Sequence, residues 1–270
     1  MAKLQGEITE NDVSIKFVLD NLSSIIQQGQ ILEERVSKKL FDEIELMILN
    51  IQNATFPKMD WQTMIWEISA NFEYKELWFA PQCWIHPKTN AGNNDITHSY
   101  AFFKLTHYDQ GHYYKPDNEF QVNNNRFPTS SFFRHDQGYI TIQFILNYNL
   151  IRELSYQYGD LTKESFDLRA YGEMRDWNKF RKNTLMQYKH LEVNGFELGG
   201  YGTFFGVKVD VLDSVLVAQE CEKGTLDKAL EPIVKALNKI NENFHIFDDI
   251  QNKAKQYYLD LEKITNEYAL

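Results

Sequence analysis

The pattern of hydrophobic and polar positions divides the chain into an extended middle and two helical flanks. Between residues 72 and 148, large β-forming residues recur in three runs, LWFAPQCWIH, ITHSYAFFKLTHYD and GYITIQFILNY, with breaking residues confined to the joins. Runs of this kind fit a pleated, half-buried surface. We therefore expect a central antiparallel or mixed sheet, and an α+β fold in which the flanking helices cover it.

The segment before the sheet, residues 9–53, has a helical pattern. Thr9 followed by Asp12 resembles a capping box, so we expect a helix to begin there. Gly29 is unfavourable in a helix interior by about 1 kcal/mol relative to alanine, and it predicts a break or a kink. Beyond it, apolar residues at helical spacing predict a second helix that covers one sheet face. These residues are Leu32, Val36, Leu40, Ile44, Met47 and Ile51.

Two segments near the sheet allow more than one interpretation. Asp60 either caps a short helix that presents Trp61, Met64 and Ile68, or precedes a strand. The polar, asparagine-rich segment from about 110 to 131 is long for a connection without secondary structure. Connections of this length are usually functional or mobile, so we include the segment in a candidate binding surface.

The chain after the sheet begins with a second helical pattern. Thr162 can cap a long helix over residues 162–193, and the Asn194–Gly195 pair then predicts a turn. The glycine-rich stretch 199–206 is followed by a strand, whereas a dinucleotide fingerprint requires a helix at that point. We therefore expect a hairpin or a bulge there. The valines on one face of the strand are Val207, Val209 and Val211.

The carboxy-terminal segment, residues 213–268, predicts a cluster of helices. Asp213 caps the first and Gly224 ends it, while Thr225 caps the next, in which Pro232 predicts a kink. The last helix has apolar residues at alternating spacings of four and three, a pattern suited to packing against another helix. These residues are Ile250, Ala254, Tyr257, Leu261, Ile264 and Tyr268.

Composition and charge narrow the class of protein. The 270 residues, 43% hydrophobic and 24% charged, suit a globular protein, and we expect a single α+β domain over residues 1–270. A net charge of −10 opposes binding to nucleic acids and anionic lipids except at a local positive surface. The two cysteines lack metal-site spacing, and neither a signal-peptide pattern nor a long apolar run is present. We expect a cytoplasmic protein that does not engage a membrane.

One candidate metal site lies at the end of the second run. His107 and Asp109 share a face if residues 97–109 form one regular strand, and His112 can fold back across the turn at Gly111. Imidazole and carboxylate groups are suitable metal ligands when they converge on one point. The alternative is that these are partly exposed strand and turn residues.

A second candidate is a divalent-metal site of the kind used by nucleases. Asp60 precedes Glu73 and Lys75, and two carboxylates beside a lysine can hold a divalent ion and orient an attacking water. This interpretation implies Mg²⁺ as the cofactor. A match of this kind has a high risk of arising by chance, so the alternative is that these are solvent-facing charges.

The third candidate is a positive stripe on the long helix. Four basic residues recur there at spacings of four, three and seven, which places them on one face. They are Arg175, Lys179, Lys182 and Lys189. Such a stripe suits phosphates, including those of nucleic acid, or an acidic protein surface, although it is also compatible with an ordinary solvated face.

These observations favour a non-catalytic binding protein that engages a protein partner or an anionic ligand through the basic stripe and the 110–131 segment. We prefer this interpretation because no complete catalytic motif, such as a P-loop, a nucleophile elbow or HExxH, occurs in the sequence. The alternative is a metal-dependent nuclease or phosphodiesterase that uses Asp60, Glu73 and Lys75.

Overall fold

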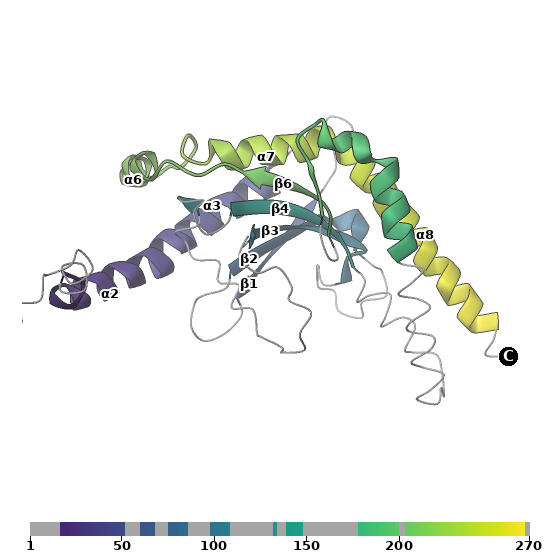
Figure 1. Cartoon of the computed structure of the whole chain (residues 1–270), viewed down its shortest axis with the longest axis horizontal. Helices are drawn as coiled ribbons and strands as arrows, with labels where there is room; N and C mark the ends of the chain where they lie inside the picture. The colour runs from purple at the N-terminus through teal and green to yellow at the C-terminus, as the bar shows by residue number, and fades with distance from the viewer. Residues whose placement is uncertain are drawn as a thin grey trace, which may run out of the picture.

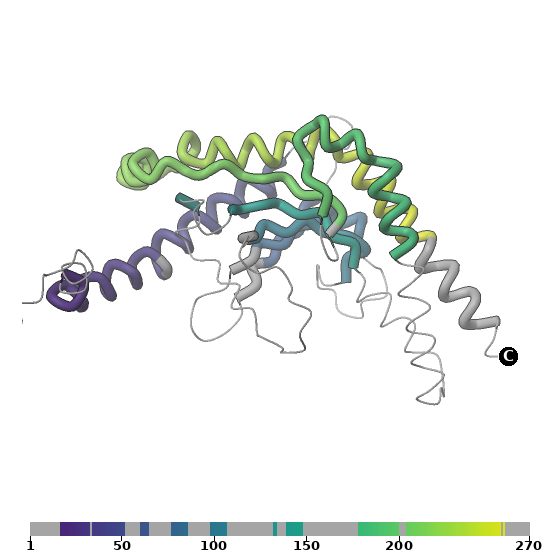
Figure 2. Tube along the Cα trace, viewed as in Figure 1, coloured from purple at the N-terminus to yellow at the C-terminus, as the bar shows by residue number. Residues whose placement is uncertain are grey.

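The central feature of the computed structural model is an antiparallel sheet of six strands in the order β1-β2-β3-β4-β6-β5. The structure describes residues 17–51, 60–67, 75–85, 98–108, 132–133, 139–147, 178–199 and 203–267 (Figure 1). Figure 2 colours those whose side chains are described as well. The strands are β1 Trp61–Glu67, β2 Lys75–Pro81, β3 Ala101–Tyr108, β4 Tyr139–Leu146, β5 Glu197–Leu198 and β6 Thr203–Val209. The predicted α+β class is confirmed, and the sheet is antiparallel throughout.

Strands β3 and β4 fall within the second and third predicted runs, β2 overlaps the first and begins before it, and the sheet extends beyond these strands on both sides. Residues 61–67 form a strand, which settles the alternative left open after Asp60. At the other side β6 pairs with β4, and its pairing shifts register between Phe144 and Ile145. Strand β5 pairs antiparallel with β6, as expected for a hairpin at the glycine-rich stretch.

Large aromatic residues on one face of the sheet form the centre of the core. Phe79, Phe103 and Phe144 lie in register on β2, β3 and β4, with neighbouring ring centroids 5.3 and 5.4 Å apart. Phe247 packs its ring 5.3 Å from Phe103 and 5.0 Å from Phe144. Buried aromatic pairs of this kind contribute both area and ring-edge contacts. The contacts of Phe247 with Phe103 and Phe144 join the sheet to the carboxy-terminal helix.

Helices from both flanks of the sheet pack on this aromatic face. The amino-terminal helices are α2 Leu22–Ile31, a π-helix Leu32–Val36 and α3 Ser37–Leu49. The carboxy-terminal helices are α6 Ser214–Lys223, α7 Glu231–Glu242 and α8 Phe244–Glu267. Helix α3 contacts β1 and β2, α7 contacts β6, and α8 contacts β4 (Figure 1). Helices α3, α7 and α8 therefore form one layer over the sheet.

Short helical segments occupy the connections. A 3₁₀ turn, Gln82–Trp84, follows β2 and buries Trp84, whose indole N–H donates to Asp248 Oδ1 at 2.9 Å. Residues 178–187 are helical and are followed by a second 3₁₀ turn, Lys189–Glu192. The part of the predicted long helix over 162–177 lies outside the described residues. Gly195 adopts a left-handed φ of 83°, as the turn predicted there requires.

The predicted ends of α6 are confirmed. Asp213 accepts from the backbone N–H groups of Val215 and Leu216, and Gly224 ends the helix with a φ of 81°. Pro232 does not kink α7, because the helix starts at Glu231 and the proline occupies its first turn. A proline there costs no hydrogen bond, since the first amides of a helix have no intrahelical acceptor.

Three further predictions about element boundaries were wrong. Thr225 does not cap α7, which starts at Glu231 with Leu230 in the cap position. Gly29 lies inside α2, and the irregularity begins at Leu32 as a π-helix. A single glycine costs too little to end a helix whose neighbouring residues favour it. Val211 lies beyond β6 and is exposed, while Leu212 is buried in its place. Among the helices that the structure describes, none is sufficiently long and apolar to cross a membrane.

Candidate functional site

The described lysines of the predicted basic stripe are exposed. Lys179 and Lys182 lie on the outer face of helix 178–187, and Lys189 begins the following 3₁₀ turn. Met186 is exposed on the same helix, whereas Thr184 is buried. Arg175 lies outside the described residues. The three lysines therefore project outward, on a chain whose total charge is −10.

Arg181 is adjacent in sequence to this stripe but has a structural role. Its guanidinium donates to the carbonyl of Gly199 at 2.5 Å and lies 5.8 Å from the ring centroid of Phe204. Burial lowers the pKa of Arg181 from its ordinary value. The side chain therefore joins the helix to the β5–β6 region rather than adding to the outer positive face.

The structure does not bring Asp60 and Lys75 together. Asp60 is exposed just before Trp61, which pairs with Pro81, whereas Lys75 pairs with Glu67 at the far end of the same two strands. Six strand residues correspond to about 20 Å, which is far more than one metal ion can bridge. Glu73 lies outside the described residues, so the nuclease hypothesis stays untested.

The predicted histidine site falls mainly on residues that the structure does not describe. His107 is on β3, where its backbone pairs with Ile140, while Asp109 and His112 lie outside the described residues. Within the described ranges, no group of three or more His, Cys, Asp or Glu side chains is placed to hold a metal ion. The metal prediction therefore remains a prediction.

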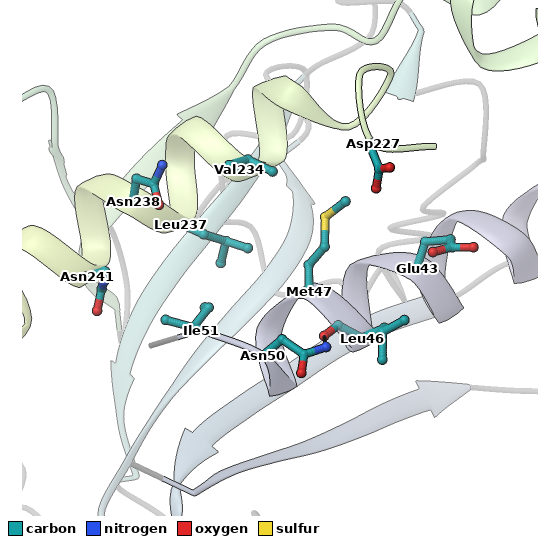
Figure 3. A pocket seen from close by; sticks show the side chains of 10 residues that line it. All are labelled: Glu43, Leu46, Met47, Asn50, Ile51, Asp227, Val234, Leu237, Asn238 and Asn241. Atoms are coloured by element: carbon teal, nitrogen blue, oxygen red, sulfur yellow. Dashed lines mark hydrogen bonds between the residues drawn. The ribbon is translucent and has the colours of Figure 1, made fainter. Parts of the chain in front are cut away.

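A groove of about 430 Å³ lies between α3 and α7 (Figure 3). Its apolar lining comes from two helix faces that the core holds in place: α3 is anchored by buried residues such as Ile44 and Ile48, and α7 by Ile233 and Ile240. The volume is within the range of sites that accept a compact ligand. The apolar residues that line it are Leu46, Met47, Ile51, Val234 and Leu237.

Polar side chains differ between the two ends of this groove. Glu43 of α3 and Asp227, in the turn before α7, lie at one end, while Asn238 and Asn241 extend along α7 toward the other (Figure 3). Glu43 also faces Lys39, with an N–O distance of 3.8 Å. A partly exposed pair at this distance contributes little, so it competes weakly with a ligand. The groove is thus acidic at one end and amide-lined at the other.

Asparagine side chains supply the polar groups at the amide-lined end of the groove. The side-chain amide of Asn50 donates to the carbonyl of Leu46 at 2.8 Å, which leaves its oxygen as an acceptor. Asn238 is exposed, and Asn241 is partly buried three residues later on the same helix face. An asparagine amide both donates and accepts, so it can pair with a peptide bond.

Sequence reasoning missed this groove. Its residues come from 43–51 and 227–241, and no local pattern indicates that these segments meet. One signal was present, because asparagine is a poor former of helix interiors and yet recurs beside the apolar positions of α7. The recurrence of asparagine indicates that this face of α7 uses polar side chains for a function other than packing.

A second polar cluster joins helix 178–187 to α8. Tyr188 donates to Asp249 Oδ2, and Lys253 donates to Tyr188 Oη at 2.8 Å and pairs with Asp249 at 2.9 Å. Burial and the hydrogen bond to Asp249 raise the pKa of Tyr188. A phenol held protonated in this way is not an activated nucleophile, so we assign the cluster a structural role.

Comparisons with known proteins identify no relative, since no protein-family model, curated protein sequence or solved structure matches the chain. The function of the protein is therefore inferred from its own residues.

Proposed function

We propose that the protein is a non-catalytic binding protein whose α3–α7 groove accepts a short segment of a partner protein. The segment presents an apolar side chain to the floor of the groove and a lysine or arginine to Glu43 and Asp227. The observation that supports this proposal is the arrangement of the groove, in which an apolar floor separates two carboxylates from a set of asparagines. We place this binding in the cytoplasm, as the sequence predicts.

Charge favours a cationic partner segment at this site. Two carboxylates at one end repel an anionic ligand, and a net charge of −10 adds to that repulsion at longer range. A basic side chain is attracted both by the two carboxylates and by the net negative charge of the chain. The asparagines can meet the backbone N–H and C=O groups of the bound segment, which otherwise lose their hydrogen bonds to water.

An apolar anchor in a groove usually provides most of the affinity. Leu46 lines the groove and is 55% exposed, so its replacement disturbs the binding surface without opening the core. Leu49 is a matched control, because it is 46% exposed on the same helix and does not line the groove.

The test is selection of a displayed random-peptide library on the immobilised full chain, followed by polarisation measurements with a selected, labelled peptide. We expect enrichment of peptides that combine an apolar residue with lysine or arginine. Leu46→Asp should weaken binding about tenfold or more, whereas Leu49→Asp should leave it within about twofold. Failure to enrich such peptides, or equal losses in the two variants, would contradict the proposal.

A further inference from the structure

Helix α2 has apolar side chains that no described part of the chain buries. Leu22, Ile25 and Ile26 are 45%, 39% and 53% exposed, and the helix has no buried residue. The helix extends away from the sheet and the other helices (Figure 1). A soluble protein seldom leaves a contiguous apolar stripe open along a helix unless another molecule covers it.

Glycine lies in the middle of this stripe. Leu22, Ile25, Gly29 and Leu32 follow one another at spacings of three, four and three, so they share one face. A Cβ atom placed on Gly29 would meet nothing within 4 Å, so no contact in the chain requires glycine there. Glycine is unfavourable in a helix interior, but it permits close approach of another backbone. The position therefore suits the crossing point of a second helix.

The charge pattern of α2 indicates which helix crosses it. Residues 17–32 contain a single charged side chain, Asp20, although charged residues make up 24% of the whole chain. The polar residues that flank the stripe are instead amides, Asn21, Gln28 and Gln30, whereas Ser23, Ser24 and Gln27 lie on the opposite side of the helix. Charged flanks select an oppositely charged partner, whereas amides can pair with amides. The surface is thus complementary to itself.

Two copies of this chain repel each other through their net charge of −10, and a neutral surface is where they can approach most closely. A membrane is less suited to this stripe, because helices that lie on membranes usually carry lysine and arginine on the polar face. Residues 17–32 contain neither. The symmetry of a two-fold dimer also requires a self-complementary patch.

We propose that α2 is a self-association surface, on which two copies of the chain pair α2 against α2 and cross at Gly29 near a two-fold axis. This inference does not depend on the proposed peptide groove, because α2 contributes no residue to that groove.

The test is sedimentation velocity of the full chain over a concentration series. We expect a monomer–dimer equilibrium in the native protein, and Ile25→Glu should weaken dimerisation about tenfold or more. Gln27→Glu introduces the same charge on the opposite side of α2 and should change dimerisation about twofold at most. Circular dichroism checks that the variants fold, which we expect because neither position is buried.

A variant at Gly29 distinguishes a specific crossing of two α2 helices from unspecific association. Gly29→Leu strengthens the helix by propensity and adds apolar surface, so unspecific association would increase. A crossing at Gly29 has no room for the new side chain, and we expect Gly29→Leu to weaken dimerisation about tenfold or more.

Three results would overturn the proposal. They are a native protein that remains monomeric at the highest concentration tested, equal effects of Ile25→Glu and Gln27→Glu, and stronger association of Gly29→Leu. Binding of a monomeric native protein to neutral phosphatidylcholine vesicles, lost in Ile25→Glu, would assign the stripe to a membrane instead.

Discussion

Glu220 shows how one side chain can organise a segment beyond its own helix. It lies on α6, is 5% exposed, and accepts hydrogen bonds from the backbone N–H groups of Lys228 and Ala229 at 3.0 and 2.9 Å. These amides belong to the turn that leads into α7. A buried carboxylate is tolerated only when it is well hydrogen-bonded, and these two donors supply that requirement. Glu220 thereby fixes the start of one wall of the groove.

We predict that Glu220→Ala lowers the free energy of unfolding by about 1–3 kcal/mol, because two amides lose a charged acceptor. Glu220→Gln keeps one oxygen acceptor and should cost less. Urea denaturation measures both. Glu222→Ala serves as the control, since Glu222 is exposed on the same helix. A loss in Glu220→Ala no larger than in Glu222→Ala would show that the two hydrogen bonds do not stabilise the fold.

At the scale of elements, the cluster of Tyr188, Asp249 and Lys253 links the end of helix 178–187 to α8. Asp249 and Lys253 are one turn apart on α8, and both contact the hydroxyl at the end of helix 178–187. The ammonium group of Lys253 also lies 5.1 Å from the ring centroid of Tyr188. The hydrogen bond that Lys253 donates to Tyr188 contributes most to raising the pKa of Lys253. In the folded state, burial and Asp249 therefore favour the protonated hydroxyl of Tyr188, while Tyr188 and Asp249 favour the charged amine of Lys253.

This linkage predicts a loss of stability in alkali. The folded-state pKa values of Tyr188 and Lys253 are raised above those of the unfolded chain, near 10, so their contribution is present below about pH 10 and is lost above it. We expect Tyr188→Phe to show a smaller decline between about pH 9 and about pH 11 than the native protein. Urea midpoints across this range measure the difference. Parallel declines in the two proteins would contradict the prediction.

Local patterns in the sequence predicted elements well where a single residue decides the outcome. Asp213 and Gly224 set the ends of α6 as expected, because a side-chain acceptor and a left-handed φ act within one turn. Pro232 was misplaced because proline is compatible with both a kink and a first turn, and the burial of Leu230 and Ile233 decides between them. Boundaries of this kind depend on tertiary packing.

For the whole molecule, the strand order and the groove were out of reach of local reasoning. Alternation predicts that β6 is a strand, but nothing in it specifies that β6 pairs with β4. The same limit applies to the α3–α7 groove, which joins segments from opposite ends of the chain. The strand order and the groove both result from burial of the aromatic face of the sheet, which has Phe103 and Phe144 at its centre. The sheet was predictable from its residues, whereas the site depends on how the flanks meet over it.

The electrostatics of the whole chain give a further prediction. Lys179 and Lys182 form a local positive face on an acidic protein, so we expect them to dominate any attraction to a polyanion. With labelled double-stranded DNA as the probe, Lys179→Glu/Lys182→Glu should reduce the slope of log affinity against log salt by about one for each lysine. Polarisation titrations at several salt concentrations measure this slope.

A double variant with the same change of charge provides the comparison. Lys223 and Lys235 are exposed on α6 and α7, away from helix 178–187, and Lys223→Glu/Lys235→Glu should leave the slope nearly unchanged. Equal effects of the two double variants, or no binding by the native protein at low salt, would remove the basic stripe from consideration as an anion-binding face.

The π-helix at Leu32–Val36 has a geometric consequence for the whole amino-terminal rod. A π turn completes one revolution with about one residue more than an α turn. Excising the exposed Glu34 would therefore restore ordinary α winding and leave the side chains of α2 at nearly the same rotation about the helix axis relative to α3. The five residues thus take up one extra residue locally, so that the direction in which the side chains of α2 point is preserved across the insertion.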